Sequence, residues 1–386
     1  MPKINLLYVI TKLELGGAQK QLLSLINALD KKKYNVFLLT AKEGYLVPEA
    51  SAIKGLILKK SRFLERLINP LKDVFALFEI YCFIKRNKIQ IVHTHSSKAG
   101  ILGRLAARLA KAPVIVHTVH GWSFNEYQSA GIKYLYVLLE RTCAAFTGKI
   151  IVVSRFDREA GLKRLIGRAG QYILIRYGLD ARRFESAKDC NKSNRILGLS
   201  DTDSVVGMVA CFKPQKAPLD FIELAALLKK DFPGTKFVLV GDGELRKKIE
   251  LRIRQLNLEG QVILTGWRDD IALILSRLDV FVLTSLWEGL PIVVLEAMAA
   301  GVALAATDTG GIREIINNGK NGYLVAPQDL LSMRERLEEL LNNPSKREEF
   351  ARSSREVINT GEFLLNNMHK NTIQLYPYLL GESKNA

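Results

Sequence analysis

The chain has 386 residues, 48% of them hydrophobic and 25% charged, and a formal net charge of +17. This length predicts roughly two domains of ~150 residues, and the composition is that of a globular protein with enough apolar material for two cores. No apolar run approaches the ~18 residues of a membrane span, and Met1–Thr11 is typical of a short strand and not of a signal peptide. The wide spacing of the four cysteines argues against a disulfide framework or a zinc site and favours a reducing, cytoplasmic compartment. They are Cys82, Cys143, Cys190 and Cys211.

The first half of the chain alternates apolar, strand-like runs with longer helical patterns, which is typical of a parallel sheet with helical crossovers. The runs are almost continuously Ile, Val and Leu, as expected of strands buried on both faces. Helices are expected at Gly17–Leu29 and Ala99–Ala110. The expected strands are Ile4–Ile10, Val36–Thr40, Leu56–Leu58, Gln90–His93, Val114–Val119 and Lys149–Val153.

The stretch Leu64–Arg86 has two interpretations. Its apolar residues recur with helical spacing on one face, and several Lys and Arg residues lie in or near its start. It is either a crossover helix packed on the sheet or an interfacial helix on an anionic membrane, and both can hold in part because basic side chains can ring a packed helix. The apolar face consists of Leu64, Leu67, Ile68, Leu71, Val74, Phe75, Phe78 and Cys82.

A second series of strands and helices begins near residue 204, and two series predict two doubly wound domains. The polar segment Asp180–Ser204 is the expected linker between them. Helices are expected at about 218–230, 244–256, 270–277 and 292–300. The expected strands are Val205–Ala210, Lys236–Val240, Gln261–Leu264, Val280–Leu283 and Val302–Ala306.

The positive charge is unevenly distributed. Residues 1–190 hold 32 Lys and Arg against 14 Asp and Glu, whereas residues 191–386 hold 24 against 25. Such a basic half attracts anionic partners, although it is also compatible with a merely solvated surface. No nucleic-acid recognition motif accompanies it, so no nucleic-acid partner is expected.

The densest chemical signal is the segment 286–296, which follows a predicted strand. A helix is expected to begin near Ile292, with Pro291 in its first turn. Its N-terminal amides and dipole favour a diphosphate, and Gly289 and Leu290 precede it in a loop that a ligand can approach closely. Glu296, among apolar neighbours in the second turn, is suited to bind ribose hydroxyls.

At these residues the chain resembles glycosyltransferase family 4, whose retaining enzymes have the α/β GT-B fold. The family carries two glutamates with seven residues between them, as Glu288 and Glu296 have here, and the segment 309–316 (TGGIREII) also matches its usual wording. The resemblance spans nearly the whole chain and is most specific over residues 205–325. It implies that Glu296 holds the ribose of a nucleotide-sugar donor and that Glu288 lies at the donor sugar.

The resemblance also implies two doubly wound, Rossmann-like domains that face each other across a cleft. The N-terminal, acceptor-side domain is expected to cover residues 1–185, and the nucleotide-sugar donor domain residues 186–361. A C-terminal helix at about 362–386 is expected to cross back to the first domain.

Further matches assign more of the site by resemblance. Gly16 and Gly17 match a glycine loop that closes over the donor, and His120 matches a histidine that contacts the transferred sugar. Lys216 matches a lysine that clamps the pyrophosphate. The family's arginine in that segment is replaced by Cys211, and Lys213 is the candidate for the missing charge.

On the nucleotide side, Gly241 resembles the family's nucleotide loop, and Trp267 and Arg268 lie where the base commonly stacks or bonds to backbone. Trp267 is equally compatible with a core position. The segment Ile175–Asp180 departs from the family's Ile-Pro-Asn-Gly-Val/Ile-Asp pattern. His93 and His95 are expected to satisfy local hydrogen bonds. No carboxylate joins the histidines at ligand spacing, so no metal site is expected.

The resulting hypothesis is a metal-independent, retaining hexosyltransferase that uses a UDP- or GDP-linked sugar as substrate and needs no cofactor. Its acceptor is expected to be lipid-linked or anionic, in envelope polysaccharide or glycolipid assembly at the inner face of the cytoplasmic membrane. A nucleotide-sugar epimerase of the same fold is the alternative. A dehydrogenase is disfavoured because no G-x-G-x-x-G follows the first strand of either series. A non-catalytic binder of anionic polymer would leave the donor motifs unexplained.

Overall fold

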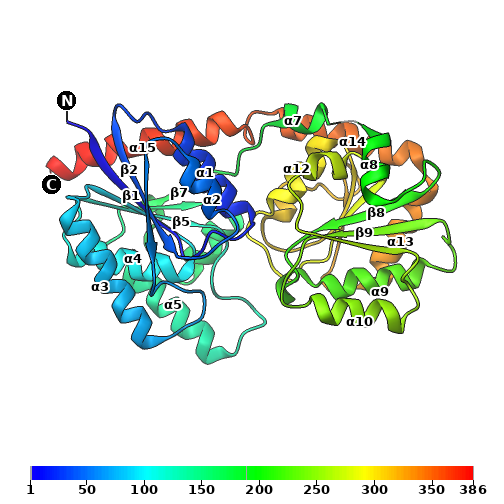
Figure 1. Cartoon of the computed structure of the whole chain (residues 1–386), viewed down its shortest axis with the longest axis horizontal. Coiled ribbons are helices and arrows are strands. Elements are labelled where there is room, and N and C mark those ends of the chain that lie inside the picture. The colour runs from blue at the N-terminus through cyan, green and yellow to red at the C-terminus, as the bar shows by residue number, and fades with distance from the viewer. Residues whose placement is uncertain (1, 188, 386) are drawn as a thin grey trace. The chain divides into compact units, whose positions relative to one another are not determined.

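The computed structural model describes residues 2–187 and 189–385, which divide into two compact units (Figure 1). Unit 1 contains the chain up to Tyr177 and again from Asn366, and unit 2 is Gly178–Leu365. Each unit is built on one parallel sheet, of seven strands in unit 1 and six in unit 2. The expected pair of doubly wound α/β sheets is confirmed.

The sheet of unit 1 has the order β3-β2-β1-β4-β5-β6-β7. The strand order reverses between β1 and β4, and this switch point is where open α/β sheets place ligands beyond the carboxyl ends of their strands. The strands are β1 (Ile4–Val9), β2 (Tyr34–Ala41), β3 (Leu56–Ser61), β4 (Ile91–His95), β5 (Val114–Val119), β6 (Lys149–Val152) and β7 (Tyr172–Leu174).

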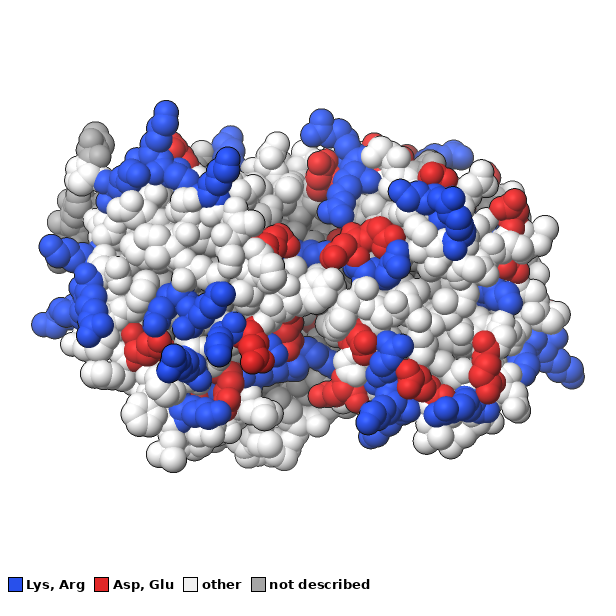
Figure 2. All heavy atoms as spheres, in the orientation of Figure 1, with Lys and Arg blue, Asp and Glu red and all other residues white. Residues whose placement is uncertain are grey.

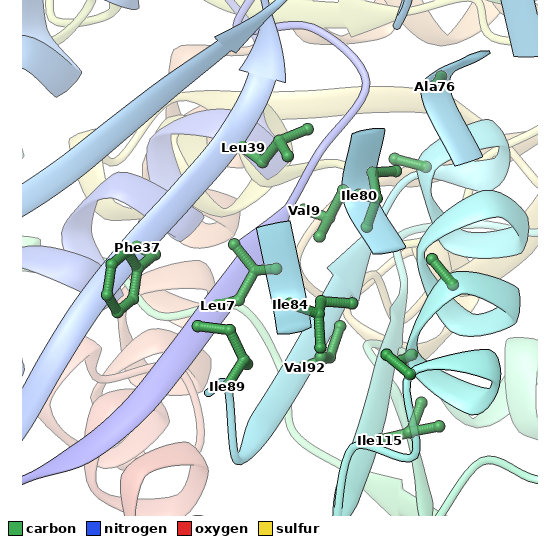
Figure 3. Packing of buried hydrophobic residues seen from close by; sticks show 14 of the residues in the cluster. Leu7, Val9, Phe37, Leu39, Ala76, Ile80, Ile84, Ile89, Val92 and Ile115 are labelled. Carbon is green, nitrogen blue, oxygen red and sulfur yellow. The ribbon is translucent and has the colours of Figure 1, made fainter. Parts of the chain in front are cut away.

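Helices cover both faces of this sheet, and the core under one face is shown in Figure 3. There Leu7, Val9 and Val92 of the strands meet Ile80 and Ile84 of α3, all nearly inaccessible to solvent. The helices of unit 1 are α1 (Gly17–Ala28), α2 (Val47–Ala52), α3 (Pro70–Arg86), α4 (Ser97–Leu109), α5 (Ala130–Ala144), α6 (Arg155–Lys163) and α15 (Leu365–Asn385).

The sheet of unit 2 has the order β10-β9-β8-β11-β12-β13, with its switch point between β8 and β11. Its strands are β8 (Ser204–Val209), β9 (Thr235–Val240), β10 (Val262–Gly266), β11 (Val280–Leu283), β12 (Ala303–Thr307) and β13 (Tyr323–Val325). Its helices are α7 (Ala181–Glu185), α8 (Cys190–Leu197), α9 (Pro218–Leu228), α10 (Arg246–Gln255), α11 (Ile271–Leu275), α12 (Ile292–Ala300), α13 (Leu330–Asn342) and α14 (Pro344–Asn359).

The expectation of a linker at Asp180–Ser204 is wrong, because this segment forms α7 and α8 of unit 2. Its polar residues serve as helix caps. The side chain of Asp189 accepts a hydrogen bond from the Lys192 amide at the start of α8, and Gly198 ends that helix with a left-handed backbone.

Helix α3 confirms the crossover interpretation of Leu64–Arg86, since it connects β3 to β4. Its packed face, however, is Ala76, Ile80 and Ile84. Most of the face expected from the sequence is exposed instead. Within the described residues, none of the helices combines the length and apolar character that crossing a bilayer requires.

The C-terminal helix α15 is joined to the sheet of unit 1 by a buried hydrogen-bond chain. The hydroxyl of Tyr376 lies 2.7 Å from that of Tyr8 on β1 and 2.8 Å from Nδ1 of His93 on β4. Nε2 of His93 in turn lies 2.7 Å from Oγ1 of Thr118. Ser24 of α1 and His369 add a hydrogen bond of 3.0 Å between α1 and α15.

Removing the Tyr376 hydroxyl should therefore destabilise the protein. Tyr376→Phe leaves two buried groups, on Tyr8 and His93, without their partner, and we expect the free energy of unfolding to fall by about 1–3 kcal/mol. Equilibrium urea unfolding measures it. The control is Tyr134→Phe, an exposed tyrosine on α5, whose effect should stay within about 0.5 kcal/mol. Equal stability of the two variants would contradict the role given to Tyr376.

Candidate active site

The candidate site in unit 2 lies where three loops meet beyond the carboxyl ends of neighbouring strands. The loops follow β8, β11 and β12, which are adjacent in the sheet. The first contains the short 3-10 turn Pro214–Lys216, the second leads into α12, and the third leads into the 3-10 helix Gly310–Glu314. Parallel strands deliver all three loops to one edge, as ligand sites in open α/β sheets require.

Glu288 is the buried acid of this site, with 9% of its surface exposed. Its Oε1 forms an ion pair with Nζ of Lys216 and accepts a hydrogen bond of 2.7 Å from Oγ of Ser285. Two residues that the resemblance assigns to donor contacts are therefore in direct contact. The sequence analysis did not predict the role of Ser285. Its position shortly after a strand and three residues before Glu288 is the feature that could have indicated a contact with Glu288.

Hydrogen bonds to backbone carbonyl groups hold the turn that carries Lys216. Oγ1 of Thr284 donates to the carbonyl oxygen of Lys216 (3.0 Å), and the Leu286 amide donates to that of Gln215 (2.8 Å). The side chain of Gln215 donates to the carbonyl of Trp287 (2.9 Å). These hydrogen bonds hold the Lys216 turn against the Glu288 loop.

Gly310 holds the third loop against the second. It has a left-handed backbone (φ 55°), and a Cβ there would lie 1.9 Å from the carbonyl oxygen of Glu288. The amide of Gly311 donates to the carbonyl of Gly289 at 2.6 Å. A glycine is thus needed at 310, since any side chain would displace the Glu288 loop.

Helix α12 begins at Ile292, as expected, but Pro291 is its N-cap with an extended backbone and so lies just outside the first turn. Ile292 and Glu296 are its half-buried residues, four positions apart, and the other seven are buried. Positions i and i+4 share one face of a helix. Glu296 therefore lies one turn after Ile292, on the same accessible side of α12. Leu290 and Gly289 are buried in the preceding loop. The end of α12 therefore combines N-terminal amides with one accessible carboxylate.

The loops after β9 and β10 lie beside this site in the same sheet. The amide of Gly241 donates to the carbonyl of Gly266 at 2.9 Å, which ties the two loops together. Trp267 is 37% exposed, so the core alternative for it is wrong. Arg268 makes two hydrogen bonds to Asp270, at 2.8 and 2.5 Å, and these hold the pKa of Asp270 below its usual value.

The segment after β8 carries the departure from the family's arginine. Cys211 forms no disulfide and is half-buried. The amide of Lys213 donates to the carbonyl of Cys211 at 2.8 Å, so the Lys213 side chain starts from the same turn as Lys216. A second cation is thus available in the segment where the arginine is missing.

The remaining expected site residues lie in unit 1 at the carboxyl edge of its sheet. Gly16 is the N-cap of α1 and Gly17 its first residue, following β1. His120 directly follows β5. Its Nε2 lies 2.9 Å from Nδ1 of His95, and its Nδ1 lies 2.7 Å from the hydroxyl of Tyr177. Both ring nitrogens of His120 are therefore engaged.

Tyr177 stands where the family pattern has asparagine, and no sequence pattern indicates its hydrogen bond to His120, 57 residues away. Beside the hydrogen-bonded residues His95, His120 and Tyr177 lies a cavity of about 30 Å³, enough for one or two water molecules. Nε2 of His95, which lines it, has no hydrogen-bond partner among the described residues. His93 satisfies both of its nitrogens, as expected, and His95 only one.

Burial keeps the histidines of this cluster neutral. Desolvation lowers the pKa of His120 to about 4, and desolvation together with the nearby His120 lowers the pKa of His93 to about 3. The pKa values of His95 and His117 are also well below the usual range, mainly through desolvation. No group of three or more His, Cys, Asp or Glu suited to a metal ion occurs in the part of the chain that the structure describes.

Family models match both halves of the chain. Residues 15–183 match the model described as Glycosyltransferase Family 4, and residues 189–357 match Glycosyl transferases group 1. The second matched range contains the Glu288 site, and the first contains His120.

Full-length relatives agree with these matches. A UDP-Gal:α-D-GlcNAc-diphosphoundecaprenol α-1,3-galactosyltransferase from Escherichia coli is 35% identical over 335 residues, which cover 85% of each chain. An α-1,4-N-acetyl-D-galactosaminyltransferase of PP-undecaprenol-linked GalNAc from Campylobacter jejuni is 24% identical over 92% of this chain and 93% of its own.

A crystal structure of Anabaena HepE in complex with UDP and glucose has the same fold. It superposes with a TM-score of 0.84 at 20% identity and covers 97% of this chain and 99% of its own.

The neutral histidines predict acid sensitivity. Below pH 6.5 the unfolded chain protonates its histidines while the native cluster stays neutral until about pH 4, so the free energy of unfolding should fall as the pH falls through this window. His120→Asn removes one such group. The slope of the free energy of unfolding against pH should therefore become smaller, by an amount that corresponds to up to about one bound proton. Urea unfolding between pH 4 and 8 measures both curves, and parallel curves would contradict a neutral, buried His120.

Proposed function

The chain belongs to glycosyltransferase family 4 and is a nucleotide-sugar glycosyltransferase, and from this premise we propose that it transfers a hexose from a UDP-linked donor, with retention, to a saccharide on an undecaprenyl-type lipid diphosphate. The E. coli and C. jejuni relatives act on undecaprenol-linked acceptors, and the first uses UDP-Gal. These relatives favour transfer over the epimerase alternative.

The observation that carries the donor assignment is the Lys216–Glu288 pair beside the start of α12. A nucleotide diphosphate placed at this helix end would meet free amides and the positive end of the helix dipole. Glu296 on the accessible face would accept the ribose hydroxyls. Trp267 and Arg268, together with the neighbouring Gly241, would line the binding site of the base.

The proposed mechanism is electrostatic. Departure of the nucleotide places negative charge on the diphosphate, and Lys216, Lys213 and the α12 amides would stabilise this charge without a divalent metal. Lys216 would then be shared between the phosphate and Glu288. Glu288 would keep its buried negative charge paired while it accepts hydroxyl groups of the sugar.

Unit 1 is proposed to supply the acceptor side. Gly16 and Gly17 would let a ligand approach the backbone closely, and His120 would contact the transferred sugar. Since both nitrogens of His120 are engaged, a sugar hydroxyl would take the place of the Tyr177 hydroxyl. A lipid-linked acceptor would place the enzyme at the cytoplasmic face of the membrane.

Removing a donor contact should reduce the rate of transfer per molecule of folded protein. We expect Glu296→Gln and Lys216→Ala each to lower acceptor-dependent UDP release at least tenfold, by loss of about 1.4 kcal/mol or more of transition-state stabilisation. The matched controls are Glu335→Gln and Lys230→Ala, both exposed in unit 2, which should keep wild-type activity. Circular dichroism checks folding, and full activity in a folded Glu296→Gln or Lys216→Ala variant would refute the site.

Nucleotide binding separates the donor classes. UDP and UDP-sugars should raise the unfolding temperature, because a ligand at 100 times its Kd adds about 2.7 kcal/mol of stability. GDP should raise it much less, and Glu296→Gln should reduce the UDP effect. Equal stabilisation by UDP and GDP would contradict a UDP-specific donor site. Conversion of a UDP-sugar to its isomer without acceptor would instead indicate the epimerase.

A further inference from the structure

A group of exposed apolar side chains lies at the start of α3 and in the loop before it. Six large apolar side chains there are between 55% and 79% exposed. Two of them precede the helix, and the four within it are spaced by three, one and three residues, which puts these four on one side of α3. We call this set the α3 apolar face: Leu67, Ile68, Leu71, Val74, Phe75 and Phe78.

Packing within unit 1 accounts for only part of this face, through stacking of Phe75 on Phe63 and of Phe78 on Tyr81. The core contacts of α3 are made by its other side, through Ala76, Ile80 and Ile84. Scattered exposed apolar residues are normal on a protein surface, whereas a contiguous set of this kind marks an interaction site.

A second exposed apolar set lies on α5, in the same layer of helices. Both α3 and α5 pack against α4. The members of this set are 45–67% exposed, and three of them follow each other at intervals of three residues. We call it the α5 apolar face: Ile132, Tyr134, Leu135 and Leu138.

Basic side chains border the α3 apolar face. Residues 54–88 hold nine Lys and Arg and only three Asp and Glu. The three acids already have cationic partners: Glu65 pairs with Lys72 at 2.8 Å, Glu79 with Lys59 at 3.0 Å, and Asp73 with Lys98 at 2.5 Å. The region is therefore strongly cationic. In Figure 2, blue Lys and Arg spheres, with some red Asp and Glu among them, adjoin white surface in the part of the view where Figure 1 labels α3, α4 and α5.

Both apolar faces lie at one edge of unit 1. Each crossover helix starts on the side where the preceding strand ends, and the exposed residues lie just before α3, in its first half, and between the third and ninth residues of α5. They therefore flank the carboxyl edge of the sheet, the edge that also carries His95 and His120.

From these observations we infer that the α3 and α5 apolar faces, with their basic border, dock unit 1 on an anionic lipid bilayer. The inference rests on the proposed function, because it would bring a membrane-embedded acceptor to the edge that carries His120. Apolar and aromatic side chains enter the boundary between headgroups and acyl chains, while Lys and Arg bind anionic headgroups. A second copy of the chain fits less well, since it would bring two cationic borders together.

Vesicle co-sedimentation of the full-length chain tests this inference. Wild type should bind phosphatidylcholine vesicles with 30% phosphatidylglycerol at least tenfold more strongly than pure phosphatidylcholine vesicles. The triple variant Leu71→Ser, Phe75→Ser, Phe78→Ser should lose at least tenfold of this binding. The control replaces two exposed leucines of unit 2, Leu251→Ser and Leu331→Ser, and should bind like wild type. The charge variant Lys60→Glu, Arg62→Glu should weaken binding to the anionic vesicles only.

Three outcomes would overturn the docking surface: no preference of wild type for anionic vesicles, unchanged binding of the triple variant, or a dimer in sedimentation velocity that the triple variant converts to monomer without a change in vesicle binding. Unchanged thermal unfolding verifies that the variants fold.

UDP release with a water-soluble, short-chain acceptor tests the proposed function separately from membrane docking. The triple variant should retain this activity and lose activity on acceptor embedded in vesicles. If wild type fails with the soluble acceptor but binds anionic vesicles, the proposed function fails and the docking surface stands.

Discussion

The arrangement of the loops in unit 2 depends on how the buried carboxylate of Glu288 is compensated. A buried charge is tolerated only when it is paired and hydrogen-bonded, and removal of one partner leaves a costly unpaired charge. Lys216 supplies the charge and Ser285 the hydrogen bond. Because Lys216 and Glu288 follow neighbouring strands, their pairing holds two loops at the same sheet edge. The close approach of Gly310 to the Glu288 backbone adds the third.

Unit 1 differs, since the histidines at the carboxyl edge of its sheet are buried as neutral rings beside a buried cation, Arg176. Desolvation keeps the pKa values of His93 and His120 low, and the neutral rings are joined to Tyr376 and Tyr177 by hydrogen bonds. The histidine network orders this edge at neutral pH but adds no charge of its own. In the proposed reaction the cations that stabilise the diphosphate therefore come from unit 2, and the histidines of unit 1 contribute shape and hydrogen bonding.

Much of this could be predicted from the sequence because the central strands are long, apolar and β-branched, and because the two glutamates with seven intervening residues mark the start of α12. The strands β7 and β13 are three residues long and give too short a pattern to detect. The polar segment 180–204 looked like a linker because helix caps and linkers share a composition. Contacts between Lys216 and Glu288, 72 residues apart, or between His120 and Tyr177 arise from strand order, which no local pattern encodes.

Helix α3 also limits what periodicity can predict. Its sequence contains two apolar stripes, one with Ile80 and Ile84 and the other with Leu71 and Phe75, and periodicity cannot tell which stripe packs on the sheet. Burial of the first stripe leaves the second in water beside a cationic segment. An exposed apolar face favours self-association, which the repulsion between like-charged borders opposes. An anionic lipid surface neutralises the cationic borders and at the same time covers the apolar face. The proposed docking on such a surface therefore explains both the positive charge and the exposed apolar residues of unit 1.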